Sequence, residues 1–139
     1  MPQVGARISE EQELWLRRHF RSKSAGAEFL LPWAIAACAG AMAEVRARFT
    51  PEELKVVVDA LEGTRILPEM AGTSYLRLAV CEACGRRGLC ALHGADAGVL
   101  DGKLAALLEP QATALLVWAS AYWHSPACAG ASLDEYVAR

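Results

Sequence analysis

Helix-forming residues dominate this chain almost from end to end, and this feature limits its fold more than any other. Ala, Leu, Glu and Arg are frequent, runs of β-branched residues are scarce, and Gly and Pro stand mostly between segments. A chain of 139 residues is long enough for one domain with a hydrophobic core and too short for two of ordinary size. We therefore predict an all-α fold, a compact bundle of roughly five to seven short helices in a single domain over residues 1–139.

Local signals predict where several helices begin. Ser9 and Thr50 are N-cap residues followed by carboxylates in the first helical turn, and Pro51 takes the first helical position. Pro32 predicts the start of another helix, which runs to Arg48. The predicted domain thus has three parts, which are a two-helix N-terminal part (residues 1–48), a main body (residues 49–124) and a C-terminal loop with a short helix (residues 125–139).

The helix that follows Thr50 has an amphipathic pattern. Its apolar residues recur at the spacing of one helical face, and they are Leu54, Val57, Val58 and Leu61. Charged residues take the opposite side, and they are Glu52, Lys55, Asp59 and Glu62. Gly63 ends the pattern. This arrangement predicts a surface helix with one buried face.

The longest apolar stretch, Phe29–Ala43, predicts a helix of the hydrophobic core. It is shorter than the about 20 residues needed to cross a bilayer, and it contains Pro32 and Gly40. Glu28 and Glu44 bracket it, so we expect no membrane span. The hydrophobic fraction of 54% is high for so small a domain. As an alternative, the helix buries its remaining apolar surface against a partner or against a second copy of this chain, so a homo-oligomer stays open.

Charge and cysteine content indicate the setting in which the protein works. The net charge of -2 argues against a protein that binds free nucleic acid, because such proteins usually carry a basic face. The five cysteines are an odd number, and the N-terminal residues lack the apolar region of a secretory signal. We therefore expect a reducing, cytoplasmic environment.

Residue types that bind metals gather in the middle of the chain. The four residues concerned are Cys81, Cys84, Cys90 and His93. Their chemistry suits zinc, although five residues between the two pairs is a short spacer for a structural zinc site. A second set with a longer spacer consists of Cys81, Cys84, His124 and Cys128.

Two other interpretations of these cysteines need no metal. Cys81 and Cys84 lie three residues apart beside a predicted apolar helix face, where a buried cysteine packs as a small apolar residue. The same pair is also a candidate redox dithiol, but it lies near a helix C-terminus, and reactive dithiols favour an N-terminus. The pattern favours core packing, so we predict no cofactor, with zinc as the alternative.

No catalytic signature is present in the sequence. It contains no phosphate-binding Walker loop, no dinucleotide-binding glycine pattern, no nucleophile elbow and no His-Glu-x-x-His motif, so we predict a protein that is not an enzyme. Two charged surfaces are candidates for partner binding. The basic one consists of Arg17, Arg18, Arg21 and Lys23, and the acidic one of Glu52, Asp59 and Glu62.

Residues 49–123 resemble a loose group of small helical proteins carried by prophages and other mobile elements. The matching motifs are Phe49-Thr50-x-x-Glu53-Leu54, then Asp59-Ala60-Leu61-Glu62-Gly63-Thr64, and later Gly88-Leu89, Leu104, Gln111, Trp118 and Trp123. Because these are helix caps and core positions, the resemblance implies a shared fold. The group often lacks the cysteines, which favours the packing interpretation.

The sequence and this resemblance together predict a non-enzymatic protein-binding factor. By analogy with small phage proteins, it would act stoichiometrically as an inhibitor or adaptor of a host protein complex. An anti-CRISPR-like inhibitor of a defence system is the specific version of this prediction. The alternative is a zinc-stabilised interaction or regulatory module. In both cases we expect a host or effector protein complex as partner, with neither free nucleic acid nor a membrane.

Overall fold

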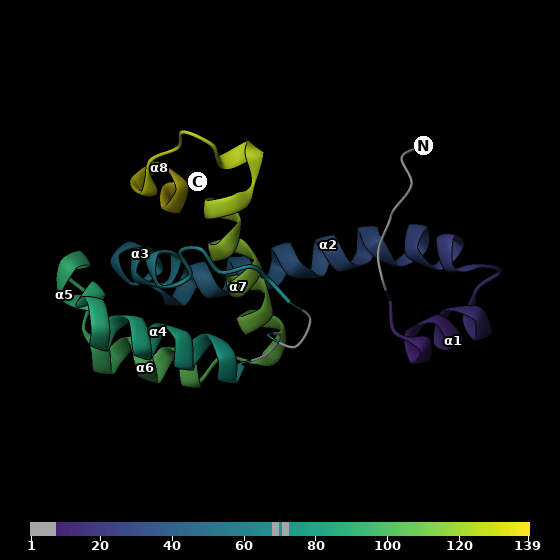
Figure 1. Ribbon diagram of the computed structural model, residues 1–139, viewed down its shortest axis with the longest axis horizontal. Helices are drawn as coiled ribbons and strands as arrows, with labels where there is room; N and C mark the ends of the chain where they lie inside the picture. The colour runs from purple at the N-terminus through teal and green to yellow at the C-terminus, as the bar shows by residue number, and fades with distance from the viewer. Residues whose placement is uncertain (1–7, 68–69, 71–72) are drawn as a thin grey trace. The chain divides into compact units, whose positions relative to one another are not determined.

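The structure is a computed structural model that describes residues 8–67, 70 and 73–139, and over these residues helices are joined by turns and short connections, without a β-strand (Figure 1). The helices are α1 (Glu10–His19), α2 (Lys23–Arg48), α3 (Pro51–Ala60), α4 (Thr73–Arg87), α5 (Leu89–His93), α6 (Ala97–Ala105), α7 (Glu109–His124) and α8 (Leu133–Ala138), with a short 3-10 turn, η2 (Pro126–Cys128), before α8. The all-α prediction is confirmed. The described residues contain eight α-helices, more than the five to seven that the sequence predicts.

The chain divides into two units, Met1–Ala37 and Cys38–Arg139, and the predicted compact single domain is not confirmed. The division falls inside α2, whereas the sequence places the end of the N-terminal part after residue 48. Residues 1–7, where the sequence lacks a signal-type apolar region, lie outside the described residues. The two units are described separately below.

In the first unit, α1 packs on the beginning of α2. Ser9 caps α1 as predicted, because its hydroxyl accepts a hydrogen bond from Gln12 N–H while the Gln12 side chain accepts one from Ser9 N–H. Gly26 of α2 is buried, and a Cβ atom there would lie only 2.8 Å from Leu16 and 2.9 Å from Phe20. The absence of a side chain at this position therefore lets the two helices approach closely.

Helix α2 begins at Lys23, so the prediction that a helix starts at Pro32 is wrong. The Ser22 hydroxyl accepts a hydrogen bond from Ala25 N–H at the start of the helix, and helix-forming residues follow. Pro32 lies inside the helix, where it removes one N–H donor. Pro32 and Glu28, whose carbonyl loses that donor, are both exposed, so water can replace the missing hydrogen bond.

Only the end of the long apolar stretch and the turn of α2 that follows it lie in the core. Ala41, Met42 and Val45 are buried in the second unit. In contrast, Phe29 is 72% exposed and Trp33 is 70% exposed, so the prediction of a core helix is wrong for this part of α2. The stretch is apolar on all sides, and the contact of the Phe29 ring with the Phe20 ring covers only part of its surface.

Helix α3 is the centre of the second unit. It contacts α4, α5, α7 and α8, and its predicted apolar face is buried. Val56 is also fully buried, and Glu53 is only 4% exposed, although neither belongs to that face. The predicted buried face is therefore confirmed, but the buried surface of α3 is wider than the sequence predicts. Four neighbouring helices cover α3 where the sequence pattern predicts only one covered face.

The C-terminal residues pack against α7 and the last turns of α2. Tyr136 of α8 donates a hydrogen bond to the Trp118 carbonyl at 2.5 Å, and the two rings stack with centroids 5.0 Å apart. Burial raises the pKa of Tyr136 to about 12. Arg46 lies over the Trp118 ring and donates a hydrogen bond to the Val137 carbonyl at 2.8 Å. These contacts fix α8 in the core of the second unit.

Substitution of Val56 tests the central position of α3. We expect Val56→Ala to lower the free energy of unfolding by about 2 kcal/mol, as much as Val57→Ala, because each removes two buried methyl groups and leaves a cavity. Val99→Ala is the matched control: Val99 is 52% exposed, and the change should stay within about 0.5 kcal/mol. Urea unfolding followed by circular dichroism measures all three. A Val56→Ala protein as stable as the control would contradict the buried position of α3.

Candidate functional site

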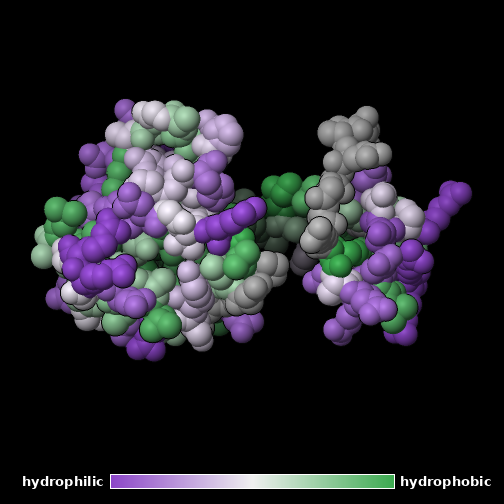
Figure 2. Space-filling view, viewed as in Figure 1, coloured by the Kyte–Doolittle hydropathy of each residue, from purple (hydrophilic) through white to green (hydrophobic). Residues whose placement is uncertain are grey.

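Four large apolar side chains on α2 are exposed to solvent. We name them the α2 apolar surface, and they are Phe29, Leu31, Trp33 and Ile35. Phe29 and Trp33 lie four residues apart and so share one helix face, as do Leu31 and Ile35 on another. Hydrophobic surface is visible along α2 in the space-filling view (Figure 2). The two pairs lie on opposite sides of α2, and large exposed apolar side chains of this kind commonly mark a contact with a protein or a membrane.

By length and composition, α2 is sufficient to cross a membrane. An 18-residue window within it has a mean hydropathy of 1.4, and only 17% of that window is buried. Of α2, however, only Lys23–Ala37 lies outside the second unit. This segment is about 22 Å long, whereas the hydrocarbon core of a bilayer is about 30 Å thick. A membrane-spanning α2 would have to withdraw Ala41, Met42 and Val45 from the core, so a protein contact fits this surface better.

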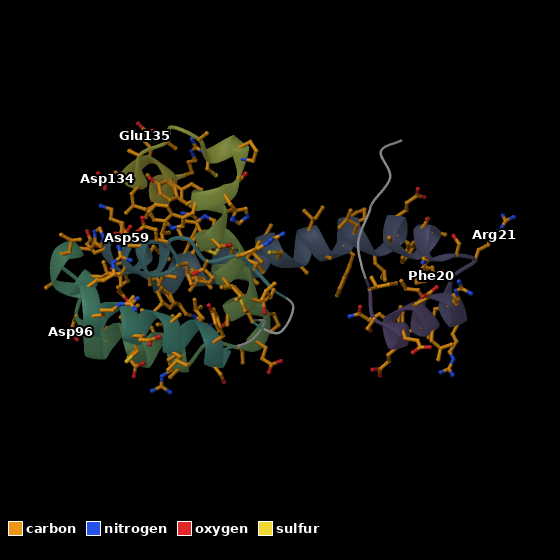
Figure 3. The ribbon with its side chains drawn as sticks, viewed as in Figure 1. Phe20, Arg21, Asp59, Asp96, Asp134 and Glu135 are labelled. Atoms are coloured by element: carbon orange, nitrogen blue, oxygen red, sulfur yellow. The ribbon has the colours of Figure 1, made fainter. Side chains whose placement is uncertain are left out.

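The predicted basic surface lies at the end of α1 and the start of α2. Arg17 and Lys23 both pair with Glu13, with N–O distances of 2.9 Å and 3.5 Å. Arg18 and Arg21 are exposed and form no ion pair with any residue that the structure describes. Arg21 extends away from the helices into solvent (Figure 3). The charge available to a partner is therefore concentrated in Arg18 and Arg21.

Most of the predicted acidic surface is already paired within the second unit. Asp59 of α3 forms a half-buried ion pair with His93 of α5 (Figure 3). Glu62 accepts a hydrogen bond of 3.0 Å from Arg87, which also donates to the Asp59 carbonyl at 3.1 Å. Glu52 remains exposed at the start of α3. These partners lie 25 to 34 residues away in the chain, and no local sequence signal identifies them.

A buried ion pair joins α3 to α6. Glu53 Oε1 accepts hydrogen bonds from Lys103 Nζ at 2.6 Å and from Thr50 N–H at 3.3 Å, which completes the predicted capping box. Glu53 Oε2 is also buried and has no hydrogen-bond partner among the described residues. The Lys103 ammonium lies 5.8 Å from the centroid of the Phe49 ring. The sequence identifies Glu53 as a cap but gives no sign of its pairing with Lys103.

The structure brings two of the central cysteines together. Cys84 of α4 and Cys90 of α5 have their sulfur atoms 2.7 Å apart. Burial raises the pKa of the Cys84 thiol to about 12, and its hydrogen bond with Cys90 acts in the same direction. The pair predicted from spacing, Cys81 with Cys84, is not the one in contact. Cys81 is exposed on α4, so the packing interpretation does not hold for it.

Neither predicted set of zinc ligands is assembled in the part of the chain that the structure describes. No three Cys, His, Asp or Glu side chains there are placed to hold a metal ion. His93 turns toward Asp59, and His124 is exposed at the end of α7. Cys90 and Cys128 are both buried and belong to the hydrophobic core. Core packing therefore describes these two cysteines.

Comparisons with known proteins return no match to a protein-family model, to a curated protein or to a solved structure. The resemblance to prophage proteins therefore stays a prediction. The candidate site rests on the geometry of the chain itself, and the α2 apolar surface is its most prominent feature.

The buried ion pair between Glu53 and Lys103 predicts a specific pattern of stabilities. We expect Lys103→Met to lower the free energy of unfolding by about 3 kcal/mol, because it leaves a buried carboxylate without its cation. Adding Glu53→Gln should recover about half of this loss, since the amide keeps an acceptor for Thr50 N–H and removes the charge. Chemical denaturation measures both proteins. Equal stability of Lys103→Met and wild type would show that the pair is not formed.

Proposed function

We propose that this chain acts without catalysis, by binding another protein through the α2 apolar surface. The exposure of Phe29 and Trp33 supports this proposal most directly, because no neighbouring part of the structure covers more than about a third of either side chain. Burying exposed apolar surface contributes about 25 cal/mol for each Å² removed from water. Aromatic residues therefore commonly provide most of the binding energy of a protein interface.

The nearby charges suit a partner with an apolar groove and an acidic border. Trp33 and Phe29 would fill the groove, while Arg18 and Arg21 belong to the same unit and are free to pair with carboxylates. Charges at the edge of an interface raise the rate of association and improve specificity more than they raise affinity. The apolar residues should therefore determine how tightly the partner is held.

A stoichiometric inhibitor or adaptor of a host protein complex is the specific form of this proposal. It is supported by the resemblance to proteins of mobile elements and by the lack of a recognised catalytic motif in the sequence. Within this class, an inhibitor of a CRISPR effector complex is the version that we propose to test first. The acidic surface is a weaker candidate for such contacts, because His93 and Arg87 already pair with Asp59 and Glu62.

Charge introduced on the α2 apolar surface should abolish binding without unfolding the protein. We expect the double variant Phe29→Glu/Trp33→Glu to lose at least about thirtyfold in affinity, because it removes two hot-spot side chains and places charges in an apolar contact. Leu92→Glu is the matched control, since Leu92 is 70% exposed on α5 in the other unit. Bacterial lysates, including cells that express a CRISPR effector, are passed over each immobilised protein. The captured proteins are quantified. A captured complex is then titrated with wild type and with each variant, and their affinities are compared.

Three outcomes would contradict the proposal. In the first, wild type and the double variant capture the same proteins in the same amounts. In the second, native mass measurement of the purified chain shows a dimer that the double variant cannot form, which would identify a second copy as the occupant. In the third, wild type sediments with phospholipid vesicles and the double variant does not, which would identify a membrane surface.

A further inference from the structure

A cavity of about 620 Å³ in the second unit has three cysteines on its wall. It lies among α4, α5 and α6, and its cysteines are Cys81, Cys84 and Cys90. This volume is in the range of sites that take small organic molecules. Cys84 is half-buried and Cys90 is buried, and both residues line this cavity.

The turn between α4 and α5 holds the two sulfur atoms in contact. Helix α4 ends at Arg87, and Gly88 follows with a φ of 63°, a left-handed conformation that suits glycine. The Gly88 N–H donates to the Cys84 carbonyl at 3.0 Å, which closes the turn. Cys84 and Cys90 thus approach each other from the two sides of a short, hydrogen-bonded connection. Their sulfur atoms are already within 2.7 Å, so a bond between them needs little movement of the backbone.

We propose that Cys84 and Cys90 form a reversible thiol–disulfide site that small organic disulfides oxidise through this cavity. One protein sulfur, as a thiolate, attacks the small disulfide and releases one small thiol, which leaves a mixed disulfide. The second protein sulfur then attacks the mixed disulfide and releases the other small thiol. One sulfur–sulfur bond is formed and one is broken. The protein loses two electrons and two thiol protons, and both small thiols carry these away.

Two features of its surroundings bear on how this site reacts. Burial holds the pKa of the Cys84 thiol at about 12, so attack should be slow at neutral pH and faster in mildly alkaline solution. The carboxylate of Asp101 on the cavity wall is held by two hydrogen bonds from Arg77, of 2.8 Å and 2.9 Å. These bonds lower the pKa of Asp101 and keep the carboxylate charged. The Arg77 guanidinium offsets this charge, so the paired carboxylate should not select strongly between a neutral and an acidic oxidant.

Oxidation would tie the end of α4 to α5. Arg87 lies between the two cysteines and His93 lies three residues after Cys90, and these two side chains hold Glu62 and Asp59 of α3. A covalent bond between Cys84 and Cys90 would restrict the separation of these segments in the unfolded chain, so the oxidised protein should melt at a higher temperature. This inference does not depend on the proposed binding surface of α2, which lies in the other unit.

The sequence provides a direct experiment, because Arg86 and Arg87 lie between the two cysteines. The full-length protein is incubated with bis(2-hydroxyethyl) disulfide at mildly alkaline pH, alkylated and digested with trypsin. Cleavage separates residues 78–86, which contain Cys81 and Cys84, from residues 88–103, which contain Cys90. We expect the two peptides to remain linked and dithiothreitol to release them. The exposed Cys81 thiol should take up the reagent as a mixed disulfide, so the linked peptides, and not the count of free thiols, decide the result.

Cys81→Ser is the matched control, because Cys81 is exposed and lies on the same tryptic peptide as Cys84. This variant should keep the linked peptides in full, which assigns the bond to Cys84. The proposal is overturned if wild type keeps all five thiols, if it carries only mixed disulfides, or if the link disappears in Cys81→Ser. Wild type and this exposed-site variant decide the question alone, so the result does not depend on the folding of variants at Cys84 or Cys90.

Discussion

The enclosure of α3 by four other helices is the constraint on which the second unit depends. Three consecutive valines, Val56, Val57 and Val58, are fully buried, so more than half of the helix circumference must find a packing partner. The polar groups of α3 must find partners as well, because an unpaired polar group is costly inside a core. Glu53 accordingly pairs with Lys103, and the Val58 carbonyl accepts a hydrogen bond of 2.7 Å from the Trp123 indole. The positions of α6 and α7 follow from these requirements.

Sequence reasoning succeeds here where the determining interactions are local. The caps at Ser9 and Thr50 involve residues three positions apart, and both form as predicted. It fails at Pro32, because the rule that proline begins a helix cannot weigh the nine helical residues before it against one lost hydrogen bond. It also fails at Val56 and Glu53. Their burial depends on how many helices surround α3, which periodicity along one segment does not reveal.

At the candidate sites, too, the sequence does not reveal contacts between residues far apart in the chain or across a turn. The spacing of Cys81 and Cys84 suggests a pair, yet the contact is made by Cys84 with Cys90 across a turn whose shape depends on Gly88. Asp59 and His93 are 34 residues apart, and only the packing of α3 on α5 brings them together. The apolar character of Phe29 and Trp33 predicts that their side chains will be buried. It does not state whether their own chain or another molecule will cover them.

Helix α2 links these observations, because its two halves are stabilised differently. Its last turns are fixed by Ala41, Met42 and Val45 in the core, whereas its first half contains Pro32 and, among the described residues, contacts α1 and Phe20 through Gly26 and Phe29. Isolated helices of about 12 to 15 residues are marginally stable in water, so the exposed half of α2 has a low intrinsic helix stability. A partner that covers Phe29 and Trp33 would therefore stabilise the helix as it binds. Helix stability and binding are therefore linked, so a substitution that stabilises the first half of α2 should also raise the affinity for the partner.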